Sequence, residues 1–208
     1  MLSFRLFGYP VRIEWMFWLL CALIGMPLLQ QQEPEALLRF LVLVAVILGS
    51  ILWHELGHAW ARRRCGEPYS EITLHGFGGL CGGPGHFTRH ETMFIAAAGP
   101  AASLLLGGAA FLPGYFGLGA DPSFRFFLVL MITVNVVWAL LNLLPVLPLD
   151  GGRIFEALVA NRRPGLAPRV GFVVALVVAF VGLATGRIFL AVIFGFLAYG
   201  NYQRMRGF

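Results

Sequence analysis

The residues most able to do chemistry are two histidines four positions apart with a glutamate between them, His54, Glu55 and His58. On a helix both imidazoles project from the same face, so they can bind one zinc ion. Glu55 can then act as general base toward a water on that ion. The competing interpretation is a pair of helix-facing histidines with a salt-bridging glutamate. It is disfavoured because such groups are costly deep in an apolar segment unless a charged group binds there.

The composition indicates an integral membrane protein. Of its 208 residues, 59% are hydrophobic and 12% are charged, and the apolar runs are separated by short charged clusters. A soluble zinc protease is excluded by the apolar run upstream of His54. We expect the lipid bilayer as a partner and no nucleic acid. The three cysteines form no Cys-x-x-Cys pair, so we expect free thiols.

Hydropathy predicts an all-α membrane protein with six transmembrane helices, forming a single domain over residues 1–208. A short N-terminal strand is expected at the membrane interface before the first span. The polar, glycine-rich segment at residues 70–80 alternates like a strand, which predicts a membrane-associated β-hairpin or loop between the second and third helices. The predicted spans are residues 15–32, 40–61, 92–112, 126–144, 170–186 and 188–203.

The arginines predict the orientation of these spans. If the N-terminus is cytoplasmic, all fifteen arginines except Arg39, Arg125 and Arg187 fall on the cytoplasmic side. The C-terminus is then cytoplasmic as well. The end of the second span, which carries His54, and the end of the fourth span lie on this same side.

Asp150 is the natural third metal ligand on this map, because it follows the fourth span. A catalytic zinc binds three protein ligands and leaves one position open for water. Pro145 and Pro148 break the helix before Asp150 and can turn its carboxylate inward. The alternative is a loop aspartate that accepts hydrogen bonds from the amides of the two following glycines.

These residues resemble the site-2 proteases, a family of intramembrane zinc metalloproteases. The chain is similar to a minimal form without PDZ or CBS domains. The resemblance covers the whole chain in the expected order and rests on four elements: Gly8-Tyr9-Pro10-Val11-Arg12, His54-Glu55-Leu56-Gly57-His58, Ala98-Gly99-Pro100, and the stretch from Asn142 through Pro145 and Pro148 to Asp150-Gly151.

The resemblance implies a role for each matching residue. His54, His58 and Asp150 would bind one Zn²⁺ per chain, and Glu55 would activate the water. Asn142 would help to hold the substrate or its developing oxyanion. The strand that contains Gly78 and Gly79 would present its edge to an unwound substrate segment. Many members carry an asparagine soon after the Gly-Pro pair, where this chain has Ser103.

The expected activity is hydrolysis of a peptide bond in or near a transmembrane segment of a membrane-protein substrate. The expected location is the cell membrane, as a multi-pass protein of a bacterial or archaeal inner membrane with its active site near the cytoplasmic side. A membrane metal transporter could use the same ligands without needing Glu55 as a base, and a non-catalytic membrane scaffold is a further alternative. A homo-oligomer is left open.

Overall fold

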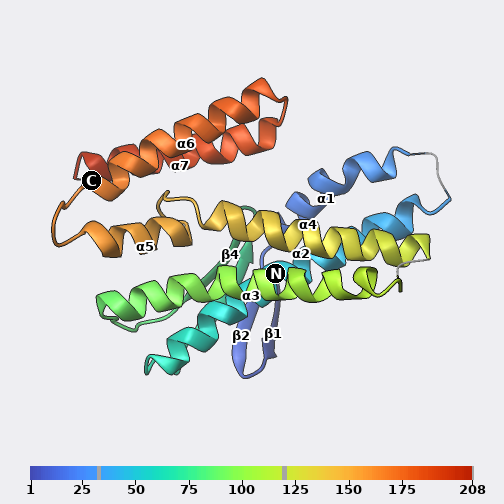
Figure 1. The fold of residues 1–208 in the computed structure, drawn as a ribbon, viewed down its shortest axis with the longest axis horizontal. Helices are drawn as coiled ribbons and strands as arrows, with labels where there is room; N and C mark the ends of the chain where they lie inside the picture. The colour runs from blue at the N-terminus through green and yellow to red at the C-terminus, as the bar shows by residue number, and fades with distance from the viewer. Residues whose placement is uncertain (32–33, 119–120, 208) are drawn as a thin grey trace. The chain divides into compact units, whose positions relative to one another are not determined.

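The structure is a computed structural model that describes residues 1–31, 34–118 and 121–207. Short strands occur in two pairs, and helices account for most of the remaining chain (Figure 1). In chain order the elements are β1 (Leu2–Leu6), β2 (Tyr9–Ile13), α1 (Trp15–Leu29), α2 (Ala36–Arg64), β3 (Glu71–His75), β4 (Gly78–Gly82), α3 (Arg89–Tyr115), α4 (Pro122–Asn142), α5 (Asp150–Val159), α6 (Leu166–Ala184) and α7 (Ile188–Met205).

The chain divides into two compact units, which are described separately. The first contains Met1–Gly85 and Ala98–Ala139, and the second contains His86–Ala97 and Leu140–Phe208. The first unit therefore holds the strands, α1 and α2. The second holds α5, α6 and α7.

The four strands of the first unit form one sheet in the order β1-β2-β3-β4. Each hairpin is antiparallel, whereas β2 and β3 pair in parallel, with Val11 opposite Ile72 and Ile13 opposite Leu74. These four side chains are almost fully buried and share a core with residues of α1 and α2, including Ile51. The alternation of buried and exposed residues is that of a sheet with one covered face.

Helix α2 extends beyond the predicted span at both ends. Its 29 residues correspond to roughly 43 Å of helix, which exceeds the ~30 Å hydrocarbon core of a bilayer. Its last turn consists of Arg62, Arg63 and Arg64. Three positive charges are favourable at the negative end of a helix dipole and unfavourable in hydrocarbon, so this end lies at an interface.

Four helices are long and apolar enough to cross a membrane, namely α2, α3, α4 and α6. The predicted first span corresponds to α1, a shorter apolar helix of 15 residues. The predicted sixth span corresponds to α7, which has 18 residues. The chain is therefore a multi-pass membrane protein whose helices lie where apolar runs were predicted.

The segment after Asp150 differs from the sequence-based expectation of a polar loop, because residues 150–159 form helix α5. Two adjacent glycines ordinarily disfavour a helix. Here they permit a close approach of the backbone instead. A Cβ on Gly151 would lie 2.7 Å from the Leu144 carbonyl oxygen, and one on Gly152 would lie 2.6 Å from the Leu147 nitrogen.

Helix α7 holds the turn that precedes α5. The Asn201 side chain is completely buried, and its amide donates to the Leu147 carbonyl oxygen at 2.7 Å and to the Leu197 carbonyl oxygen at 2.8 Å. A buried amide that satisfies a loop carbonyl fixes the course of that loop. Asn201 therefore helps to position the chain that delivers Asp150.

Candidate metal centre

Helix α2 places His54 and His58 on one buried face, as the four-residue spacing predicts. Their exposed fractions are 2% and 7%, so neither imidazole is a surface group. The two Nε2 atoms lie 3.1 Å apart, and the rings meet edge to face with their centroids 4.8 Å apart. Both rings thus direct the same nitrogen toward one point.

Glycines allow α3 to pass directly beside these rings. A Cβ on Gly99 would lie 2.5 Å from His58 Cε1 and 2.7 Å from His54 Nε2, so no larger residue fits. On the facing helix, a Cβ on Gly57 would lie 2.7 Å from the Ala98 carbonyl oxygen. The small residues of both helices therefore allow a close approach, and it occurs at the two histidines.

Ser103 fixes the orientation of the first histidine. Its hydroxyl is fully buried and lies 3.0 Å from His54 Nδ1. If Nδ1 carries the proton and donates to this oxygen, the Nε2 lone pair is left to bind a metal. No sequence motif predicts this contact between Ser103 and His54. The only indication is that Ser103 lies one helical turn after Gly99.

Replacing Ser103 with alanine is expected to weaken zinc binding by about 10- to 100-fold, because the partner that orients a ligating imidazole is lost. Competition with a fluorescent zinc chelator would measure the change. Ser123→Ala, at an exposed position near the start of α4, is the matched control. An unchanged affinity in Ser103→Ala would mean that the hydroxyl only fills space.

The candidate base, Glu55, lies against strand β4. The side chain is only 4% exposed, and a Cβ on Gly79 would fall 2.5 Å from its Cγ and 2.6 Å from its Cδ. The neighbouring Gly78 has a φ of +128° and lies against the Trp138 ring. Both predicted substrate-contacting glycines thus belong to the strand beside Glu55, and a Cβ on either would overlap a neighbouring side chain.

Asp150 is the first residue of α5 and is 6% exposed. His54, His58 and Asp150 are the buried candidate ligands, and each has one atom to offer a metal ion. Two neutral imidazoles and a carboxylate are ligands that zinc commonly takes in catalytic sites. Asn142, the remaining predicted residue, is half-buried at the C-terminal end of α4, before the turn that leads to Asp150.

The spacing of the imidazole nitrogens fits zinc. Two nitrogens at about 2.0–2.1 Å from a tetrahedral ion are roughly 3.3 Å apart, and the observed separation is 3.1 Å. A carboxylate as the third ligand would leave a fourth position for water. The donor set therefore suits a catalytic rather than a fully closed structural site.

The other histidines lie apart from these ligands in the fold. His75 belongs to β3, and its Nδ1 accepts a hydrogen bond from the Phe77 N–H at 3.2 Å. Burial lowers the pKa of His75, although the Glu14 carboxylate opposes that shift. His86 and His90 are exposed, and His90 is the second residue of α3.

Comparison with known proteins shows that the chain is similar to metalloproteases. The model of "Peptidase family M50" matches residues 115–185. The Rip3 protein of Mycobacterium tuberculosis is 40% identical over 151 residues, which are 67% of this chain and 38% of that protein. The chain thus spans well under half the length of that relative. The zinc metalloprotease MJ0392 of Methanocaldococcus jannaschii is 26% identical over 98% of this chain and 60% of that protein.

The fold also matches a solved structure. The site-2 protease from Methanocaldococcus jannaschii superimposes with a TM-score of 0.71, covering 97% of this chain and 94% of that one at 24% sequence identity. The predicted ligands, their zinc-compatible geometry and these similarities agree with one another. The chain is therefore similar to peptidase family M50 and to zinc metalloproteases, and it has the fold of a solved site-2 protease.

Proposed function

We propose that residues 1–208 form one protease domain, a zinc metalloendopeptidase that cleaves a membrane-protein substrate in or near a transmembrane segment. One observation carries this proposal: two imidazoles whose Nε2 atoms lie 3.1 Å apart, and a carboxylate, are each at least nine-tenths buried in an otherwise apolar chain. Polar groups at such depth are unfavourable unless they serve a site.

Each polar residue then has a chemical role. His54, His58 and Asp150 hold the ion, and Ser103 orients His54. A zinc ion at this position supplies a Lewis acid that lowers the pKa of water toward ~7 and polarises the scissile carbonyl. Glu55 accepts a proton from the attacking water and returns it to the leaving amine. Asn142 donates its side-chain amide to the substrate or to the developing oxyanion.

Strand β4 receives the substrate in this proposal. It is the last strand in the sheet order, so one of its edges pairs with no other strand of the described sheet. A helical peptide hides its carbonyls in internal hydrogen bonds and must unwind before water can attack one. Pairing with β4 would hold the extended segment beside Glu55, because Gly79 contacts that side chain.

Substituting Gly79 with valine is expected to lower kcat/KM on the order of 10²-fold, because the added carbons displace the Glu55 carboxylate from its productive position. Gly82→Val is the matched control, since a Cβ on Gly82 meets nothing within 4 Å. Both variants place the same side chain in the same strand. Equal activity of the two would remove β4 from the proposed site.

The orientation in the membrane is part of the proposal. We propose six spans, with α1 and α7 crossing in addition to the four long helices. Both termini and the metal centre then lie toward the cytoplasmic side of a bacterial or archaeal inner membrane. The arginine distribution supports this orientation. Labelling of single cysteines introduced at the helix ends with a membrane-impermeant maleimide would measure it.

Reconstitution in liposomes tests the function and separates it from its alternatives. The purified chain is expected to cleave single-span membrane proteins, to lose that activity after treatment with a zinc chelator, and to regain it when zinc is restored. A metal transporter would instead carry zinc into the vesicles without producing fragments. A scaffold would do neither, and either of these two results would overturn the proposal.

A further inference from the structure

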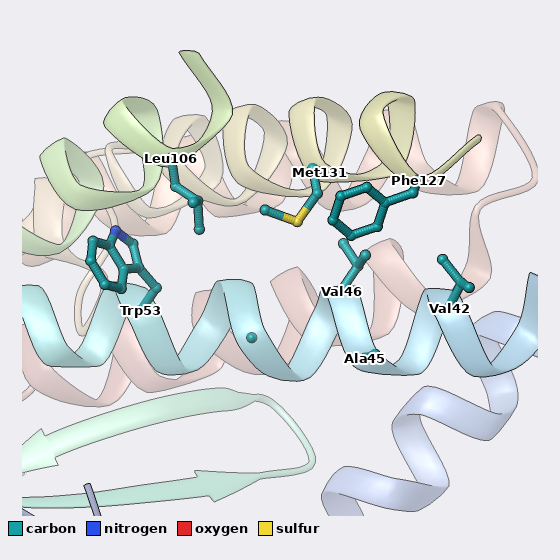
Figure 2. Close-up of a pocket in the computed structure, with 8 residues that line it drawn as sticks. Val42, Ala45, Val46, Trp53, Leu106, Phe127 and Met131 are labelled. Atoms are coloured by element: carbon teal, nitrogen blue, oxygen red, sulfur yellow. The ribbon is translucent and has the colours of Figure 1, made fainter. Parts of the chain in front are cut away.

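An apolar groove runs along the first unit, away from the histidine pair. It lies between α2 and the facing helices α3 and α4, as the close-up shows (Figure 2), and has a volume of about 340 Å³. Its only indole, Trp53, directs its N–H to the Ala102 carbonyl oxygen at 3.1 Å. The lining is therefore hydrocarbon and sulfur, contributed chiefly by Val42, Val46, Gly49, Trp53, Phe127 and Met131.

The length of the groove corresponds to one leaflet of a bilayer. From Val42 to Trp53 the helix rises about 16 Å, which is close to half of the ~30 Å hydrocarbon core. The three helices that line it are all candidate membrane spans. A groove of this depth and composition is filled by hydrocarbon rather than by water.

Positive charge lies at the Val42 end. Arg39 precedes Val42 by one helical turn, and its guanidinium carbon lies 5.9 Å from the centre of the Phe126 ring, which adjoins Phe127 of the lining. Its Nη2 donates to Glu35 at 3.3 Å. A guanidinium has five N–H donors, so this contact leaves capacity to bind a phosphate. Arg125 adds a second charge next to Phe126.

We propose that this groove binds one acyl chain of an anionic phospholipid, whose phosphate contacts Arg39. The charge at one end and the hydrocarbon lining together match the two parts of a phospholipid.

Photocrosslinking with the full chain tests the proposal. Phosphatidylglycerol carrying a diazirine on its acyl chain would be reconstituted with the protein in nanodiscs, and labelled peptides would be mapped by mass spectrometry. We expect labels within residues 42–53 and 127–131. Gly49→Phe should reduce them at least fivefold, because a Cβ at Gly49 meets nothing within 4 Å and the ring can enter the groove.

Matched variants distinguish a change of labelling caused by the groove from one caused by a general effect on the membrane helices. Gly108→Phe adds the same ring at an open position of α3 and should leave the labelling unchanged. Arg39→Gln should weaken labelling by phosphatidylglycerol more than labelling by phosphatidylcholine, whereas Arg5→Gln, on strand β1, should not. Thermal unfolding of each variant checks that it is folded.

Two results would overturn the proposal. One is equal labelling of the wild type, Gly49→Phe and Gly108→Phe, with all three folded. The other is displacement of the lipid label by a single-span peptide that itself crosslinks to residues 42–53, which would assign the groove to a helix. Neither readout depends on proteolysis, so failure here is distinguishable from failure of the proposed activity.

Discussion

Glu55→Gln is expected to lower cleavage by about 10²- to 10⁴-fold, the usual contribution of a general base, while zinc stays bound. Glutamine preserves the shape of the side chain but cannot accept the proton of the attacking water. Because Glu55 is buried beside β4 and follows His54 directly, the substitution leaves the three proposed ligands in place. Fragment formation from a single-span substrate and zinc content by mass spectrometry would be measured on the same sample.

Glu156→Gln is the control for this prediction, since it removes an exposed carboxylate from α5 and should leave cleavage unchanged. The zinc content distinguishes a role of Glu55 in proton transfer from a role in supporting the metal centre. An inactive Glu55→Gln that still contains zinc assigns the glutamate to proton transfer. Full activity in that variant would refute the assignment, and loss of zinc would show that the carboxylate supports the metal centre instead.

Gly99→Ala is expected to abolish both zinc binding and cleavage. The added methyl would lie 2.5 Å from His58 Cε1 and 2.7 Å from His54 Nε2, well inside van der Waals contact, so both imidazoles must move. Misplacement of reacting groups by about 1 Å can cost 10²-fold in rate, and displacement of two ligands at once should cost more. Zinc stoichiometry and cleavage would be compared with those of the wild type.

Gly108→Ala provides a closely matched control in the same helix. A Cβ at this position meets nothing within 4 Å, so alanine should leave activity intact and can stabilise the helix by up to about 1 kcal/mol. Both variants make the same change of residue type nine positions apart in α3. If Gly99→Ala retained its zinc, the close approach of α3 to the imidazoles would not constrain the site.

Local patterns were sufficient to predict the histidine pair. The spacing of His54 and His58 determines that they share a helix face, and the apolar run around them determines that this face is buried. The role of Asp150 was predicted from the map of the spans and the three protein ligands of a catalytic zinc, and the role of Asn142 came from the resemblance to a family. Their neighbourhood depends on α7, through the Asn201 contact to Leu147, and no local signal links such distant positions.

Two features of the fold could not be predicted from the sequence because they depend on contacts between distant segments. A short N-terminal strand and a later β-hairpin or loop were predicted separately, but the parallel pairing of Val11 with Ile72 joins both regions into one sheet. Helix α5 was not among the predicted helices, and Gly151 and Gly152 disfavour a helix when considered alone. Their lack of side chains serves the close approach of the backbone at Leu144 and Leu147.

The parallel pairing of β2 with β3 also affects timing during biosynthesis. Strand β2 emerges from the ribosome first and must wait for its partner until α1 and α2 have been synthesised, since both helices lie between them in the chain. Closing so long a loop comes late in folding. A nascent chain therefore lacks the completed sheet, to which β4 belongs, until α1 and α2 have been synthesised.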